Sequence, residues 1–303
     1  MICGGSNFSS FVSPPSMSTY INRIRLSSEI LDSARATLLE AAQREEAADV
    51  PNEVVLLENV SLERYIRYRN NRPTLNVNIR LLDGNIVAYE VPLDDHSAPA
   101  SALDRLMGGW SNRMLGFPEL DIKIGQNTMY HADVAFRPRG LPQPPAGQGV
   151  NATGNPYPTM VVEIGTSESL SSLHSLARGY FAAITTIEVY LAIKVFPGRA
   201  NGTRAIVALL YLRPSVVPTL VKSFGTAPLH HHTRSYLQNV GVANNTFSGL
   251  GFGAPGCTGA GIPDYQLPIP ASRLFSVLPV PQGLSINFVI DLFVLQDVIL
   301  NPS

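Results

Sequence analysis

The sequence predicts an α/β fold with a mixed sheet, flanking helices and additional β-hairpins. The composition is that of a folded chain, with 45% hydrophobic and 15% charged residues, against a typical charged fraction of about 25%. From residue 100 onward the hydrophobic patterns follow the order helix, three strands, helix, strand. The period changes from two to 3.6 directly after Gly165, which is typical of a strand that leads into a helix.

The chain divides into three parts in this prediction. Residues 1–26 are rich in Ser and Pro and are expected to form a loose N-terminal segment. Residues 27–54 carry an accessory helix, with apolar side chains at three- and four-residue spacing, and a linker. Residues 55–303 are expected to form a single domain, with its core at 100–196.

Three elements precede the central strands. The run 61–70 favours a short helix that begins at Ser61, because a serine side chain can accept a hydrogen bond from the free N–H groups of the first turn. Two alternating runs flank Asp83-Gly84 within residues 75–93 and predict a β-hairpin, since Asp-Gly accommodates the positive φ of a tight turn. A second helix is predicted at 100–115.

The predicted core is built from five further segments. Strand-like runs occupy 120–125, 130–138 and 159–165, a helical pattern follows at 169–184, and 187–196 is again strand-like. The C-terminal half adds strands after residue 204, and its apolar end is expected to close the domain as a buried strand or helix. The sequence has no run of 18 apolar residues, so a transmembrane helix is not expected.

Two carboxylates interrupt the apolar strand runs. Asp133 and Glu163 lie on consecutive predicted strands, and a buried charge is costly unless it is paired or binds a metal. If the strands are antiparallel neighbours, the two groups can meet on one face and hold a divalent cation between them. The alternative is structural, with Glu163 paired with Arg137 or His131 or facing solvent at a strand end.

The segment that carries these acids resembles a family of restriction endonuclease-like proteins in the PD-(D/E)XK nuclease superfamily. The resemblance rests on "YHADVAFRP", "TMVVEIGTSESLSSLHSLARGYF" and "IEVYLAIKVF", and upstream on "VSLERYIRYR" and "LLDGNIVAYEVPLDDHSAPASALDRLM". It covers residues 55–200 and, through "IPASRLF", a part of 265–280. It implies that Asp133 and Glu163 bind Mg²⁺ or Mn²⁺ and that the protein is an endonuclease acting on DNA.

The sequence departs from the family pattern at two positions. Ala132 stands where the motif has Pro, and Gly165 stands where the motif has the Lys that positions the attacking water. The following helix offers His174 and Arg178, and Arg178 is the candidate that replaces the missing basic group. An arginine can stabilise charge but cannot release a proton at neutral pH, so it supplies half of the role. Lys123 and Lys194 on the flanking strands are more typical of ordinary strand lysines.

These observations leave two hypotheses from different classes. The first is a magnesium-dependent nuclease that hydrolyses phosphodiester bonds of DNA. The second is a catalytically degenerate module that keeps the nuclease fold and binds a protein or nucleic-acid partner. A net charge of −1 provides no overall basic field for nucleic acid, so DNA binding needs a local basic patch.

The remaining features are weaker. The start of the chain lacks a signal-peptide pattern, and Cys3 and Cys257 have no CxxC partner, so an intracellular location, cytoplasmic or nuclear, is expected. A homodimer is compatible with the sequence. The triplet His230–His232 has no fourth zinc ligand at finger spacing, and the glycine-rich run 249–261 reads as a loop.

Overall fold

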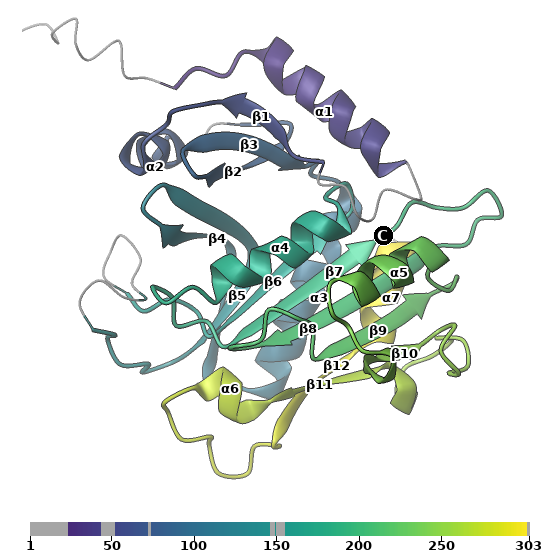
Figure 1. Ribbon diagram of the computed structural model, residues 1–303. Coiled ribbons are helices and arrows are strands. Elements are labelled where there is room, and N and C mark those ends of the chain that lie inside the picture. Colours follow the sequence, from purple (N-terminus) through teal and green to yellow (C-terminus); the bar gives the residue numbers. More distant parts are fainter. Residues whose placement is uncertain (1–23, 44–51, 72–73, 146–148, 150–154, 302–303) are drawn as a thin grey trace, which may run out of the picture.

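The computed structural model describes residues 24–43, 52–71, 74–145, 149 and 155–301 (Figure 1). The predicted loose segment 1–26 therefore lies almost wholly outside the described residues, and so does most of the linker after the first helix. The division into an accessory segment and a single domain stays a prediction.

The described chain alternates helices and strands. The helices are α1 (Ser28–Ala42), α2 (Leu62–Asn70), α3 (Asp94–Trp110), α4 (Leu170–Tyr180), α5 (His231–Asn239), α6 (Ala271–Phe275) and α7 (Leu292–Leu300). The strands are β1 (Val54–Leu57), β2 (Asn78–Leu82), β3 (Asn85–Glu90), β4 (Met114–Gly125), β5 (Thr128–Pro138), β6 (Met160–Gly165), β7 (Val189–Val195), β8 (Ala205–Leu212), β9 (Leu220–Gly225), β10 (Phe247–Gly249), β11 (Gln266–Pro270) and β12 (Asn287–Asp291).

One large mixed sheet organises the molecule and confirms the predicted α/β fold class. Its strands run in the order β1-β3-β2-β5-β6-β7-β8-β9-β10, and β4 pairs with β5 outside this path. β5 pairs antiparallel with both β4 and β6, whereas β6 and β7 are parallel. A parallel pair needs a crossover connection, and α4 supplies it. The helix–three strands–helix–strand order expected from residue 100 is therefore present as α3, β4, β5, β6, α4 and β7.

Helices cover both faces of the central strands. In Figure 1, α4 lies in front of β6 and β7, and α3 lies behind them. α4 buries Leu170, Leu173 and Leu176 in the cluster on its face of the sheet. The opposite face packs against α3, α7 and the β11–β12 hairpin. Burial on both faces explains why β6 and β7 have almost no exposed residue along their length.

A third cluster packs around β1, β2 and β3. α1 contributes Leu31, Ala34 and Leu38, which repeat at helical spacing, and α2 contributes the buried Tyr65. The Ser27 and Ser61 side chains accept hydrogen bonds from N–H groups of the first turns of α1 and α2, and the predicted cap at Ser61 is confirmed. This part of the molecule meets the central sheet where β2 pairs with β5.

The boundaries differ from the sequence prediction in three places. α3 begins and ends several residues before the predicted 100–115, and β4 starts at Met114 instead of Leu120. β4 tolerates Pro118 because it pairs only with β5, so one edge of the strand needs no ladder hydrogen bond there. None of the described helices combines the length and the apolar character needed to cross a bilayer.

Candidate metal and catalytic site

The two predicted carboxylates lie on paired antiparallel strands. β5 and β6 pair antiparallel, and the last pair of their ladder, Val134 opposite Val162, lies directly beside Asp133 and Glu163. The charge of Asp133 raises the pKa of Glu163, so the two carboxylates lie close to each other. The backbone N–H of Ile164 donates to Asp133 Oδ2 at 2.6 Å, which fixes the Asp133 side chain across the strand pair.

Both carboxylates are removed from water. Asp133 is 9% exposed and Glu163 is 2% exposed. Burial raises the pKa of both groups well above their usual values, because a desolvated carboxylate resists ionisation. The negative charge of Asp133 raises the pKa of Glu163 further. Two effects lower the pKa of Glu163. They are the charge of Arg80 and the hydroxyl of Tyr180, which donates a hydrogen bond to Glu163 Oε1.

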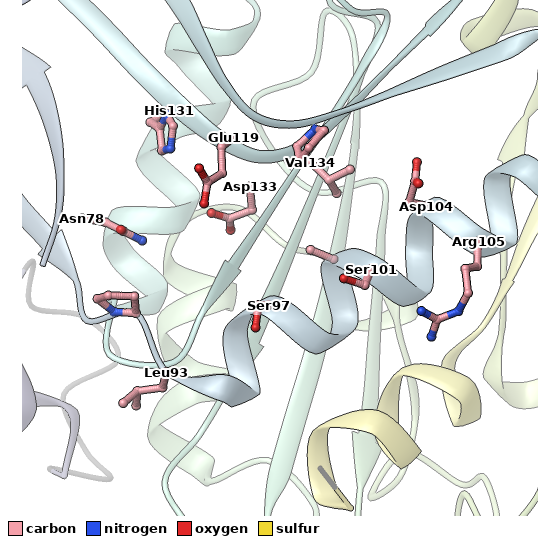
Figure 2. A pocket seen from close by; sticks show the side chains of 13 residues that line it. Asn78, Leu93, Ser97, Ser101, Asp104, Arg105, Glu119, His131, Asp133 and Val134 are labelled. Atoms are coloured by element: carbon pink, nitrogen blue, oxygen red, sulfur yellow. The ribbon is translucent and has the colours of Figure 1, made fainter. Parts of the chain in front are cut away.

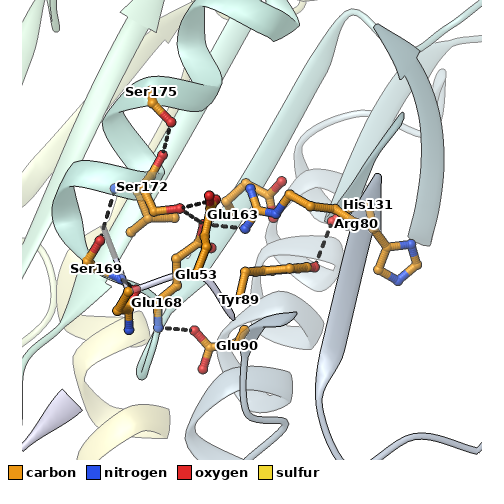
Figure 3. A network of polar contacts seen from close by, with 12 residues as sticks. Glu53, Arg80, Tyr89, Glu90, His131, Glu163, Glu168, Ser169, Ser172 and Ser175 are labelled. Carbon is orange, nitrogen blue, oxygen red and sulfur yellow. Dashed lines mark hydrogen bonds and ion pairs between the residues drawn. The ribbon is translucent and has the colours of Figure 1, made fainter. Parts of the chain in front are cut away.

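A third buried acid, Glu168, follows β6 and was not predicted. It forms an ion pair with Arg80 and accepts a hydrogen bond from Ser172 Oγ at 2.6 Å (Figure 3). Burial raises the pKa of Glu168 to about 7, against the lowering effect of Arg80. The sequence signal was weak, because Glu168 stands in the serine-rich turn where an exposed helix-start acid is equally typical.

Glu90 at the end of β3 is a fourth buried acid that the sequence analysis missed. Its carboxylate accepts hydrogen bonds from the backbone N–H groups of Thr166, Ser167 and Glu168 at 2.6–3.2 Å. It also accepts from the hydroxyls of Thr166 and Ser167, at 2.6 and 2.8 Å. Glu90 therefore fixes the turn between β6 and α4 by hydrogen bonds. The sequence held a signal for it, because Glu90 interrupts the apolar run "IVAYEVPL" just as Glu163 interrupts the apolar run of β6.

Arg80 on β2 is the cation of this acidic cluster. It is 1% exposed, and its guanidinium lies 3.5 Å from the centroid of the Tyr89 ring. Nη2 pairs with Glu168, whereas Nε and Nη1 have no hydrogen-bond partner among the described residues. Its charge acts on Asp133 and Glu163 as well, lowering the pKa of each.

The missing motif lysine has a structural explanation at Gly165. A Cβ atom there would lie 2.8 Å from Leu173 Cδ1 and 3.1 Å from the Glu168 carbonyl oxygen, so a side chain would require Leu173 to move and would press on the Glu168 carbonyl. The parallel partner of Gly165 on β7 is Lys194. Lys194 is buried, donates to the Thr166 carbonyl at 2.7 Å, and has a pKa lowered by burial to about 8.

The structure does not bring the other predicted basic group to the carboxylates. Arg178 is exposed on α4, and the helix instead turns Tyr180 toward Glu163. His174, on the same helix, contacts the hydroxyl of Tyr211 at 3.0 Å. Arg178 was assigned from its place after the motif, but residues two apart on a helix point in directions about 200° apart, so Arg178 and Tyr180 could not both face the sheet.

The predicted structural alternative for Glu163 is not formed. Arg137 donates to the carbonyl of Pro156, and His131 contacts Asp121 and Arg69. At 2% exposure Glu163 does not face solvent either. Its described neighbours are thus Tyr180 and the charges of Asp133, Glu168 and Arg80.

A cavity of about 570 Å³ opens beside Asp133 (Figure 2). This volume lies within the range of about 300–1,000 Å³ that is typical of ligand pockets. Ser97, Ser101, Asp104 and Arg105 line it from α3, and Figure 2 shows Glu119, His131 and Asp133 on the strand side. Glu119 has a φ of 51°, an uncommon value for a residue with a side chain, and lies between the ladder pairs Pro118–Val134 and Leu120–Ala132. Asp133 is therefore reachable from solvent through the cavity, whereas Glu163 does not line it.

The remaining predicted motif lies elsewhere. His230, His231 and His232 begin α5, with ring nitrogens within 4.8 Å of one another, and two of the three are exposed. None of them lines the cavity or contacts the buried carboxylates among the described residues.

Comparison with known proteins adds one structural similarity. No protein-family model matches the chain, and no curated protein matches it. Among solved structures, the chain is similar to a protein described as "a putative nuclease belonging to DUF820" from Anabaena variabilis. The match has 13% sequence identity and a TM-score of 0.38, and it covers 59% of this chain and 99% of the other. A TM-score this low does not establish an activity, so the function has to be inferred from the side chains.

Proposed function

We propose that the protein is a divalent-metal-dependent nuclease that hydrolyses phosphodiester bonds of DNA. The observation that carries the proposal is the neighbouring pair of buried carboxylates, Asp133 and Glu163, of which Asp133 lines an open cavity. A fold does not need two repelling acids at one point of its sheet, and strongly perturbed carboxylates beside a cavity are typical of functional sites.

The donor set fits Mg²⁺ or Mn²⁺. These ions prefer carboxylate and other oxygen ligands, and Asp133 and Glu163 would hold the ion. The raised pKa values of both groups mean that their charges are poorly compensated in the protein alone. A bound divalent ion supplies Lewis acidity and lowers the pKa of a coordinated water.

The protein's own groups prepare this site. Ile164 and Tyr180 donate to one oxygen of Asp133 and one of Glu163, and so orient the two carboxylates. The amine of Lys194, beside Gly165 in the sheet, has a pKa of about 8 and can hold or release a proton near neutral pH. The cavity gives a phosphate access to Asp133, and the packed sheet behind Glu163 excludes water.

A hydrolysis assay with Mn²⁺ tests the proposal. Single-stranded DNA, duplex DNA and the small diester bis(p-nitrophenyl) phosphate serve as substrates for wild type, Glu163→Gln and the control Glu29→Gln, whose side chain is exposed on α1. We expect Glu163→Gln to reduce the rate by about 100-fold or more, because it removes charge at the reacting centre. Equal rates for wild type and Glu163→Gln would contradict the proposal.

A second candidate is the degenerate module, and Arg80 favours it. A buried guanidinium already offsets part of the negative charge that a metal would neutralise, and the space for a side chain at Gly165 is crowded by Leu173 and the Glu168 carbonyl. The two candidates differ in metal binding, because an ion that binds only the folded state raises the melting temperature. A wild-type protein whose melting temperature does not respond to Mn²⁺ supports the degenerate module.

A further inference from the structure

Helix α2 carries the densest group of basic side chains near the cavity. Arg64, Arg67 and Arg69 lie within its nine residues, and Glu63 is its one acid. Arg67 is 62% exposed, and its only described partner is Glu63, an exposed helix neighbour. Exposed pairs of this kind contribute little stability, so the guanidinium remains free to exchange Glu63 for another anion.

Two contacts place α2 along the β4–β5 hairpin. At its start, the N–H of Leu62 donates to Asn127 Oδ1 in the turn between the strands, at 3.2 Å. At its end, Arg69 lies 3.7 Å from Asp121 on β4 and 3.1 Å from His131 on β5. Lys123 is exposed on β4 between these two points, on the same side of the strand as Asp121. Arg64 and Arg67, three residues apart, lie on one side of α2, whereas Arg69 is turned toward the hairpin that carries Lys123. We call the region formed by Arg64, Arg67, Arg69 and Lys123 the α2 surface.

The α2 surface ends at the cavity. His131, which Arg69 contacts, lines the cavity, and Asp133 follows two residues later, about 7 Å along the strand. The cavity itself is acidic, with Asp104, Glu119 and Asp133 against Arg105. Positive charge is thus concentrated beside the proposed metal site and negative charge within it.

We propose that the α2 surface binds the backbone phosphates of a nucleic-acid strand whose neighbouring phosphate enters the cavity beside Asp133. This inference rests on the proposed function and names the surface that holds its substrate. α2 is about 13 Å long, the axial length over which one strand of a B-form duplex carries about four phosphates. The guanidinium fork suits phosphate oxygens.

The charge of the chain makes such a surface necessary. Net charge is −1, so the protein as a whole does not attract a polyanion. The helix that follows β6 has one basic residue, Arg178, besides His174, and it covers the face of β6 and β7. Among the described elements next to the cavity, α2 is therefore the one with the charge to bind phosphates.

Binding in chelator separates this inference from catalysis. The variant is Arg64→Ala/Arg67→Ala, which spares Arg69 and its contacts with Asp121 and His131. The control, Arg139→Ala/Arg234→Ala, removes the same charge from exposed arginines beyond the end of β5 and on α5. The probes are a fluorescently labelled single-stranded oligonucleotide and its duplex, titrated over a range of KCl concentrations.

We expect the α2 variant to bind both probes more weakly and with a smaller salt dependence. Loss of two phosphate contacts lowers the slope of log K against log salt by about 1.4 for a single strand and about 1.8 for a duplex. The size of the change identifies which form lies on α2, and the control should keep the wild-type slope. An unchanged slope in the α2 variant, or no binding by wild type, overturns the inference. Tighter binding of poly-glutamate than of the oligonucleotide also overturns it.

Hydrolysis of bis(p-nitrophenyl) phosphate keeps the two proposals apart, because this diester is too small to bridge from the cavity to Arg67. The α2 variant should hydrolyse it at the wild-type rate with Mn²⁺. If wild type hydrolyses the diester and the α2 variant keeps the wild-type salt slope, the α2 surface is contradicted and the nuclease proposal is supported. If the α2 variant has a reduced slope and wild type does not hydrolyse the diester, the α2 surface is supported and the nuclease proposal is contradicted.

Discussion

Glu90 and Glu163 look alike in the sequence and differ in the structure. Each stands in an apolar strand, and each is almost completely buried, at 1% and 2% exposure. Glu90 accepts five hydrogen bonds from the turn between β6 and α4. Glu163 accepts one, from Tyr180, and faces the charge of Asp133.

The difference shows which property separates a structural carboxylate from a candidate functional one. Burial is the same for both groups, so burial does not distinguish a structural carboxylate from a functional one. The number of hydrogen-bond donors does distinguish them, because donors stabilise a buried carboxylate, whereas a neighbouring acid destabilises it. Isosteric substitutions at the two positions therefore test the comparison directly.

The largest effect is expected for Glu90→Gln. The amide removes the charge from five hydrogen bonds and presents N–H groups to donors, so several buried donors lose their acceptor. We expect the free energy of unfolding to fall by about 3–5 kcal/mol in urea titrations with chelator present. A fall below about 1 kcal/mol would mean that Glu90 does not hold the turn.

The matched substitution Glu163→Gln should act in the opposite direction. Without metal it removes repulsion with Asp133, so stability should be unchanged or slightly higher. With Mn²⁺ at about 100 times its dissociation constant, wild type should gain about 2.7 kcal/mol, and the variant should gain nothing. Thermal melts of both proteins in chelator and in Mn²⁺ measure the two effects. Strong destabilisation of Glu163→Gln in chelator would assign Glu163 a structural role like that of Glu90.

The fold was largely predictable because its signals are local. The alternation along β5 and β6, the period change after Gly165 and the serine caps of α1, α2 and α4 all follow from neighbouring residues. The boundaries of α3 and β4 were not predictable, because pairing with β5 alone lets Pro118 remain within a strand.

The candidate site was predictable only in part. Asp133 and Glu163 stood out because each interrupts an apolar strand, and the structure does pair their strands. Arg80, Glu90 and Glu168 come together from β2, β3 and the turn after β6, separated by up to 88 residues in the chain. Such contacts depend on the sheet order β3-β2-β5-β6, which a single sequence does not reveal.

The pH dependence of stability sharpens the comparison without metal. The carboxyl groups of Asp133, Glu163 and Glu168 have pKa values raised in the folded state, that of Glu168 to about 7 from 4.5. The folded state therefore holds more protons than the unfolded state above pH 4.5, and stability should fall as pH rises toward 7, by about 3 kcal/mol from Glu168 alone. Lys194 has the opposite effect on stability, because its pKa is lowered to about 8 from 10.5, so it adds stability as pH rises from 8 to 10.5.

Urea midpoints measured in chelator from pH 5 to 8 should decrease with pH in wild type and decrease less in Glu163→Gln. A midpoint that rises over this range would contradict the assignment of strained carboxylates.

The smallest effect is expected for Tyr180→Phe, which removes the one hydrogen bond that Glu163 accepts. The phenyl ring keeps its edge-on contact with Tyr130 and its packing against Tyr190, so the loss is confined to one buried hydrogen bond, about 1 kcal/mol of stability. The Tyr180 hydroxyl also lowers the pKa of Glu163, so in the variant Glu163 should hold its proton more tightly. The variant should therefore bind Mn²⁺ more weakly at pH 6 than at pH 8. Calorimetric titration of Mn²⁺ at the two pH values measures this, with Tyr211→Phe as the control, because Tyr211 is equally buried but contacts His174. If Tyr180→Phe and Tyr211→Phe change Mn²⁺ affinity to the same degree, Tyr180 does not orient a metal-binding carboxylate, and its hydrogen bond serves only to satisfy a buried acid as the turn does for Glu90.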